Sequence, residues 1–186
     1  EVKFEKLVEE LKKAKHFIFL EYFIIEEGIM WNTILEILKE KAKEGVDVRV
    51  IYDDVGCVMK LPYKYGDKLE KYGIKCRVFN PFIPIFTNRL NNRDHRKIAV
   101  IDGHTAFTGG INLADEYINE KELFGHWKDT AIMVKGEAVK SFTIMFWEMW
   151  DVTEKSEEDY EKYINDIEYE NDLHLKEESY MIPFGD

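Results

Sequence analysis

Cysteine, proline and long apolar runs are all scarce in this sequence. Its 186 residues contain two cysteines, Cys57 and Cys76, and only four prolines. The cysteines form neither a CxxC pair nor a zinc quartet, which argues against a disulfide scaffold and a structural metal site. No apolar run approaches the ~18 residues needed to cross a bilayer, and the charged opening EVKFEKLVEELKK is unlike a secretory signal. We therefore expect a soluble chain with two buried thiols.

An excess of positive charge is also missing. The formal net charge is −11, but residues 151–186 hold 13 of the 37 acidic residues and only 3 of the 26 basic ones. Residues 1–150 thus carry 24 acidic and 23 basic side chains and are nearly neutral. We expect one domain over residues 1–150, followed by an acidic helix and linker over residues 151–186. The net charge of the whole chain therefore says little about the surface that binds a substrate.

Apolar periodicity predicts that helices and strands alternate in the first half. Helical spacing over residues 2–14 precedes the apolar run HFIFLEYFII, which is typical of a buried strand. The segment TILEILKEKAKEG predicts a helix that ends at Gly45, and VDVRVIYDD predicts a second strand. A helix over residues 65–72 then leads to the strand-like IKCRVFN. This alternation indicates an α/β sandwich in which helices flank a mixed sheet.

The pattern changes after Asn80. The segment PFIPIFTNRLNNRD has two prolines and no clear period, which predicts an unusually apolar loop. RKIAVIDGHTAFTGGINL predicts a hairpin that turns near Asp102-Gly103, WKDTAIMVKG a last strand, and EAVKSFTIMFWEMW an amphipathic helix. Near the end of the chain, ESYMIPF is strand-like. Because side chains alternate along a strand, the hairpin is expected to place His95 and Lys97 on one face.

One short pattern becomes informative through its surroundings. The spacing H-x-K occurs three times, at His95/Lys97, His126/Lys128 and His174/Lys176. Only the first copy has an aspartate five residues after its lysine, Asp102, and only this copy is followed by a Gly-Gly-x-Asn run, Gly109 to Asn112. The combination HRKIAVID and GGIN on a predicted hairpin is far more specific than either part alone.

These residues resemble the phospholipase D superfamily, whose signature is H-x-K-x4-D followed by G-[SG]-x-N, and within it the first half of bacterial cardiolipin synthases. The resemblance extends over nearly the whole chain, through EYFII, KAKEGVDVRVIYDDVG, NNRDHRKIAVIDG, FTGGINLADEY, HWKDTAIMVKGEAV and FWEMW. Asp102, Gly109 and Gly110 form the structural part of the signature. Gly110 stands where many superfamily members have Ser, so one candidate hydroxyl donor to phosphate is missing, although Gly is usual in the cardiolipin synthase branch.

Phosphodiester chemistry explains why these residue types occur together. An anionic ester needs a nucleophile that is neutral before attack, and fixed positive groups that balance the charge of the transition state. The imidazole of His95 meets the first need and would form a phosphohistidine. Lys97 and the Asn112 amide would hold the non-bridging oxygens. The resemblance implies that Asp129 orients His95, as carboxylates do in hydrolytic triads.

The resemblance also implies a reaction and its partners. One phosphatidylglycerol would donate its phosphatidyl group to the terminal hydroxyl of another, giving cardiolipin and free glycerol. No metal or organic cofactor is expected, since lysine and asparagine balance the charge. The expected partners are the phospholipid and a membrane surface, so the full-length protein is expected to be membrane-associated and this piece of it soluble.

A single signature is half of the expected site. Two signatures face each other in the superfamily, one histidine acting as nucleophile and the other as general acid. The sequence lacks an initiator Met and stops about where a second half would begin, so we expect a piece of a longer enzyme that is nearly inactive alone. The alternative is a single-copy protein that completes its site as a two-fold homodimer.

Two other functions stay open at this point. A single-signature nuclease or phosphodiesterase would act on nucleic acid and would need a basic groove. Arg89, Arg93 and Arg96 favour that reading, whereas the nearly neutral body and the apolar loop favour a lipid over nucleic acid. A non-catalytic dimerisation or membrane-docking module would keep the signature only as a scaffold, against which the intact residues argue.

Two segments have more than one interpretation. The loop from Pro81 to Phe86 either contacts acyl chains at a membrane or packs onto the protein itself. Glu21 lies within an apolar strand, where an unpaired carboxylate is costly to bury, so it either faces the site or forms a salt bridge.

Overall fold

Helices and strands alternate along the first half of the chain and are followed by three consecutive strands. The computed structural model describes residues 1–81, 92–123, 125–154, 158–164, 181 and 183. The strands are β1 (Phe17–Tyr22), β2 (Asp47–Asp53), β3 (Lys75–Phe79), β4 (Lys97–Ile101), β5 (Thr105–Gly109) and β6 (Ala131–Lys135). The helices are α1 (Val2–Lys13), α2 (Ile29–Lys43), α3 (Asp54–Cys57), α4 (Tyr65–Glu70) and α5 (Val139–Thr153), with short 3-10 turns η2 (Asp115–Ile118) and η3 (Glu161–Tyr163).

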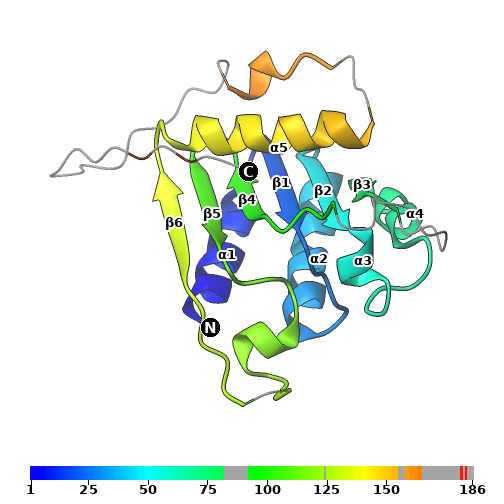
Figure 1. The fold of residues 1–186 in the computed structure, drawn as a ribbon. Helices are drawn as coiled ribbons and strands as arrows, with labels where there is room; N and C mark the ends of the chain where they lie inside the picture. The colour runs from blue at the N-terminus through cyan, green and yellow to red at the C-terminus, as the bar shows by residue number, and fades with distance from the viewer. Residues whose placement is uncertain (82–91, 124, 155–157, 165–180, 182, 184–186) are drawn as a thin grey trace, which may run out of the picture.

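The strands form one mixed sheet in the order β3-β2-β1-β4-β5-β6 (Figure 1). β1, β2 and β3 run parallel, and β4, β5 and β6 each run antiparallel to the preceding neighbour in the sheet. All six residues of β1 are buried, which explains why this central strand is a continuous apolar run and not an alternating one. The last residues of β1 and β5 lie beside the first residues of β4 and β6. We call this end of the strands the site edge.

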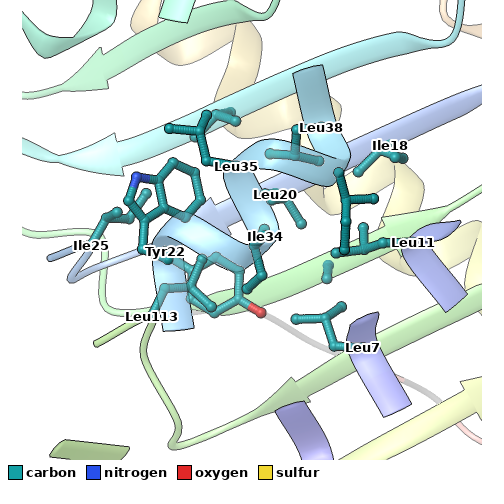
Figure 2. Close-up of a cluster of buried hydrophobic side chains, with 14 of the residues drawn as sticks. Leu7, Leu11, Ile18, Leu20, Tyr22, Ile25, Ile34, Leu35, Leu38 and Leu113 are labelled. Atoms are coloured by element: carbon teal, nitrogen blue, oxygen red, sulfur yellow. The ribbon is translucent and has the colours of Figure 1, made fainter. Parts of the chain in front are cut away.

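Two hydrophobic cores cover the two faces of the sheet. On one face, α1 and α2 pack against alternate strand residues, as Figure 2 shows for Leu7, Leu11, Ile34, Leu38, Ile18 and Leu20. On the other face, α5 contributes Phe142, Phe146 and Trp147, which pack with Phe19, Ile98 and Val100. Lys97 falls on the α1 and α2 face, because it alternates with Ile98 along β4.

A buried arginine connects three elements on the α5 side. Arg49 of β2 is fully buried, with its Nη2 atom 2.8 Å from Asp47 Oδ2 and 2.5 Å from Glu158 Oε2. The same nitrogen donates a hydrogen bond to the Tyr163 hydroxyl at 3.0 Å. The guanidinium carbon lies 4.5 Å from the centre of the Trp147 ring. Arg49 thereby joins β2 to α5 and to the η3 turn through charge pairs and a cation–π contact.

The predicted α/β sandwich is confirmed, and so is the hairpin. Asp102 and Gly103 both have positive φ, at 50° and 62°, and the His104 amide donates to the Ile101 carbonyl at 3.1 Å, as a type I′ turn requires. One detail of the prediction was wrong. His95 lies two residues before β4 and not within it, so only Lys97 belongs to the strand.

Some predictions fall on parts of the chain that the structure does not describe. The apolar loop lies almost entirely within residues 82–91, and most of ESYMIPF and of the acidic segment lies beyond residue 164. The division at residue 150 stays a prediction. Within the described ranges, no helix combines the length and the apolar character needed to cross a bilayer.

Candidate active site

His95 and Lys97 come together at the site edge. Lys97 opens β4 and pairs with Tyr22, the last residue of β1, and His95 precedes it by two residues. The ring of Phe23 contacts both side chains, with its centre 4.9 Å from that of the His95 ring and 5.3 Å from Lys97 Nζ. His95 is exposed, whereas Lys97 is only 3% exposed. An accessible imidazole beside a sheltered ammonium suits an anionic ester that arrives from solvent.

Burial favours the neutral forms of both His95 and Lys97, a direction that the chemistry needs only at His95. Desolvation and the Lys97 charge lower the pKa of His95, against the weaker effect of the Asp94 and Asp53 carboxylates. Desolvation likewise lowers the pKa of Lys97 to about 8, while Asp94 and Asp129 oppose the shift. At pH 7, His95 is therefore mainly neutral and Lys97 mainly charged.

Asn112 is held rigidly three residues beyond the end of β5. It is 3% exposed, its Oδ1 accepts a hydrogen bond from the Ile24 amide at 3.0 Å, and its Nδ2 donates to the Tyr117 hydroxyl at 2.8 Å. A carboxamide nitrogen carries two hydrogens, so one donor is left for another acceptor. Its contact with a phosphate oxygen stays a prediction.

Asp129 lies just before β6, next to Gly110. Its Oδ1 accepts a hydrogen bond from the Thr130 amide at 2.7 Å, and its Oδ2 accepts one from Trp127 Nε1 at 3.4 Å. A Cβ atom at Gly110 would stand 2.3 Å from Asp129 Oδ1, so glycine leaves room for this carboxylate. No hydrogen bond joins Asp129 to His95 among the residues described. The orienting role of Asp129 therefore stays a prediction.

The remaining signature residues contact the backbone. Asp102 lies at the far end of β4 from His95, and its carboxylate accepts three backbone hydrogen bonds of 2.8 Å, from Lys15, His16 and Phe17. Gly109 has φ 144°, and a Cβ atom there would lie 2.3 Å from the Thr130 carbonyl oxygen. These contacts tie the hairpin to the start of β1 and allow β5 and β6 to approach closely.

Buried carboxylates pair with the arginines that flank His95. Arg93 Nη1 lies 3.3 Å from Asp53 Oδ1, and Arg96 Nε lies 2.6 Å from Glu21 Oε1. Asp53 and Glu21 are fully buried, and burial raises the pKa of Glu21 well above its usual range. The contact with Arg96 agrees with the salt-bridge interpretation of Glu21, and Arg96 opposes the rise of the Glu21 pKa. Asp53 was missed, because nothing in a strand-ending aspartate indicates its partner.

Sequence reasoning also missed Lys3, which has the spacing of an ordinary helix-surface lysine. Lys3 is half-buried in the first turn of α1, and its Nζ donates to the Ile111 carbonyl at 3.0 Å and to the Tyr22 hydroxyl at 3.3 Å. Burial lowers the pKa of Lys3 to about 7; the Asp129 carboxylate opposes this shift and the Lys97 ammonium adds to it. Lys3 is thus electrostatically coupled to two predicted site residues.

Two cavities adjoin the signature residues. The larger, of about 940 Å³, is lined by His95 and Lys97 and by apolar side chains of α5, including Phe142, Met145 and Met149. The smaller, of about 390 Å³, is lined by the start of α1 and by residues 126–129, and we call it the α1 cavity. Ala131 and Ile132 line both cavities, so the two flank the edge strand β6, one beside α5 and the other beside α1.

An α/β sandwich with H-x-K at the start of β4 and G-G-x-N after β5 defines a phospholipase D-type domain. Residues 7–150 match the family described as "Cardiolipin synthase, PLD-like domain". The chain belongs to this family.

Individual relatives agree with that membership. The chain is 52% identical to an uncharacterized protein of Streptococcus mutans over 184 residues, which are 99% of this chain and 39% of that protein. It is 43% identical to a cardiolipin synthase of Alkalihalophilus pseudofirmus over 145 residues, which are 77% of this chain and 29% of the synthase. The chain thus spans well under half the length of these relatives.

Solved structures share the fold. A phosphatidylserine synthase from Haemophilus influenzae aligns with a TM-score of 0.63 at 17% identity, covering 89% of this chain and 40% of that chain. Nuc, a phospholipase D family member from Salmonella typhimurium, aligns with a TM-score of 0.57 at 18% identity, covering 79% of this chain and 86% of that chain. At these identities the likeness supports the fold alone.

Proposed function

We propose that this chain is one catalytic half of an enzyme that transfers a phosphatidyl group from one phosphatidylglycerol to another and so makes cardiolipin. One observation carries the proposal: the exposed His95 and the sheltered Lys97 share the Phe23 ring, and both line a large cavity to which α5 contributes apolar side chains. The cavity offers apolar contacts to a lipid, and the pair offers a nucleophile and a cation to its phosphate.

The reaction has two steps. A nitrogen of His95 attacks phosphorus, a P–N bond forms and the P–O bond to glycerol breaks, while an imidazolium from a second signature gives the glycerol oxygen its proton. The terminal hydroxyl of a second phosphatidylglycerol then attacks, a P–O bond forms, the P–N bond breaks, and the hydroxyl proton passes to that imidazole. Lys97 and Asn112 hold the non-bridging oxygens in both steps, and Asp129 orients His95.

The second signature has to come from outside these 186 residues. We infer that it lies elsewhere in the same chain, because the related cardiolipin synthase is more than three times as long as the matched segment. A second copy of this chain is the alternative source. The isolated half is expected to be nearly inactive, and a strictly monomeric sample with robust activity would contradict the two-signature requirement.

The nuclease alternative loses support from the charged residues. Arg93 is ion-paired with buried Asp53, and Arg96 lies 3.3 Å from Asp94 Oδ1 as well as beside Glu21, so both charges have carboxylate partners within the fold. Arg89 lies outside the described residues. A groove that follows a nucleic-acid backbone needs uncompensated cations along its length.

The assay that tests the proposal uses the full-length protein and phosphatidylglycerol vesicles. We expect cardiolipin, phosphatidic acid where water replaces the second lipid, and glycerol in an amount equal to the sum of these two products, all measured by mass spectrometry. Cleavage of a single-stranded oligonucleotide without any lipid product would assign the site to the nuclease alternative.

The pH dependence of kcat/KM should follow the two shifted groups. Neutral His95 and protonated Lys97 are both required, so the rate should rise as His95 loses its proton below pH 6.5 and fall above about pH 8 as Lys97 loses its charge. The Lys97→Arg variant should have a lower kcat/KM, but its kcat/KM should no longer fall above about pH 8, because guanidinium stays charged. An alkaline limb that is unchanged in this variant would assign it to another group.

A further inference from the structure

We propose that the α1 cavity binds the phosphate of the acceptor lipid, with Lys3 as its principal cation. This inference rests on the proposed function, in which two anionic lipids meet at one site. His95, Lys97 and Asn112 serve the phosphate of the donor only. The acceptor carries a second phosphodiester of its own, separated from its attacking hydroxyl by the length of one glycerol, and that charge needs a separate place close to the first.

The position of Lys3 meets that requirement. Its Nζ donates to the carbonyl of Ile111, the residue before Asn112, and lies 5.0 Å from the centre of the Tyr22 ring. Tyr22 is in turn the register partner of Lys97 across β1 and β4. Lys3 therefore contacts a direct neighbour of Asn112 in sequence and a direct neighbour of Lys97 in the sheet, and these are two of the groups assigned to the donor phosphate. α1 brings it there from a part of the sequence remote from the signature.

The charge in the α1 cavity favours an anion. Its lining has three lysines, Lys3, Lys6 and Lys128, and two carboxylates, Glu1 and Asp129. Lys6 is ion-paired with Glu9 at 2.9 Å, and Asp129 accepts hydrogen bonds from Trp127 and Thr130. Among the residues that the structure describes, the direct partners of Lys3 Nζ are a hydroxyl and a carbonyl, both neutral, so none of them compensates its charge by contact.

A cation in this state is suited to bind a phosphate. Burial lowers the pKa of Lys3 to about 7, so its ammonium form is disfavoured while the cavity is empty. A phosphate oxygen within contact distance would restore that form and gain a charge-assisted hydrogen bond. Asp129 acts on both Lys3 and Lys97, and Tyr22 contacts Lys3 and is the register partner of Lys97, so the two phosphates would lie close together.

The test measures how the phosphatidyl-enzyme divides between two acceptors. The full-length protein is given phosphatidylglycerol vesicles in buffer with ethanol, and the ratio of cardiolipin to phosphatidylethanol is measured. Both products come from the same intermediate, so the ratio reports acceptor recognition and is independent of the first step. Lys3→Gln should lower the ratio by about tenfold or more, the loss of roughly one charge-assisted contact, with little change in the rate of phosphatidylethanol formation.

Matched variants make the result decisive. Lys12→Gln removes an exposed lysine from the same helix and should leave the ratio unchanged. Lys3→Arg should recover part of the ratio. Lys128→Gln changes an exposed residue that lines the α1 cavity and should also lower the ratio of cardiolipin to phosphatidylethanol. This variant tests the subsite if Lys3→Gln does not fold.

The outcomes that overturn the inference differ from those that overturn the function. An equal loss of both products with an unchanged ratio would make Lys3 a structural clamp for α1. An unchanged ratio in Lys128→Gln as well would remove the acceptor subsite. Wild-type protein that forms neither product would reject the proposed function itself.

Discussion

Replacement of His95 by alanine is expected to slow phosphatidyl transfer by the full-length protein at least ~10⁴-fold, because the variant has no nucleophile. The proposed phosphohistidine is labile in acid, so the reaction is stopped with alkaline denaturant and the peptides are analysed by mass spectrometry. Wild-type protein should carry a phosphatidyl adduct on the peptide that contains His95, and the variant should carry none there. Retained full activity, or an adduct only on another peptide, would contradict the assigned role.

The control for this experiment is a second exposed histidine. His16 lies before β1, at the end of the sheet opposite His95. Its backbone amide, and not its side chain, donates a hydrogen bond to the Asp102 carboxylate. His16→Ala should therefore transfer phosphatidyl groups at the wild-type rate. A comparable loss in both variants would indicate general damage to the fold.

Arg49→Ala is expected to lower the free energy of unfolding by about 1.5–3 kcal/mol, the net contribution of hydrogen bonds to charged groups, because the carboxylates left behind are partly exposed and can be hydrated. The change leaves Asp47 and Glu158 without their shared partner and removes the cation from the Trp147 ring. Urea unfolding of the 186-residue chain measures this loss. Tryptophan fluorescence can follow it, because the Trp147 ring contacts the altered side chain. A change below about 1 kcal/mol would show that Arg49 contributes little.

Two variants separate the contributions at this position. Lys75 Nζ also pairs with Asp47, at 3.1 Å, but its side chain is 52% exposed. Lys75→Ala should therefore cost less than about 1 kcal/mol. Arg49→Lys keeps the charge but loses the planar group that contacts two carboxylates and an aromatic ring together, so it should fall between Lys75→Ala and Arg49→Ala.

The fold could be predicted because local and long-range demands agree along most of the chain. The run FIFLEY predicts a strand buried on both faces, and β1 occupies that place in the centre of the sheet. Asp102 and Gly103 tolerate the positive φ that a two-residue hairpin turn requires, so the sequence locates the turn correctly. In both cases the local residue types favour the structure that the whole fold requires.

The site was only partly predictable, because its remaining contacts depend on the tertiary fold. His95 and Lys97 are two residues apart in sequence and are readily recognised. Lys3 reaches the same region from α1, and Asp53 pairs with Arg93 across 40 residues, so no local pattern indicates either contact. Glu21 alone gave a signal, since a carboxylate inside an apolar strand demands a partner.

The strand order has a consequence for how the protein is made. β1 emerges first from the ribosome, β2 adds to one side of it and β3 to β2, and then β4 adds to the other side, β5 to β4 and β6 to β5. Every strand thus meets a partner that has already been synthesised, and the sheet grows outward from its centre in the order of translation. The edge of β1 that pairs with β4 waits longest for its partner, because β2 and β3 are both made before residue 97. Slow decoding of residues 80–96 would prolong the exposure of that edge, and with it the interval in which a nascent chain can aggregate.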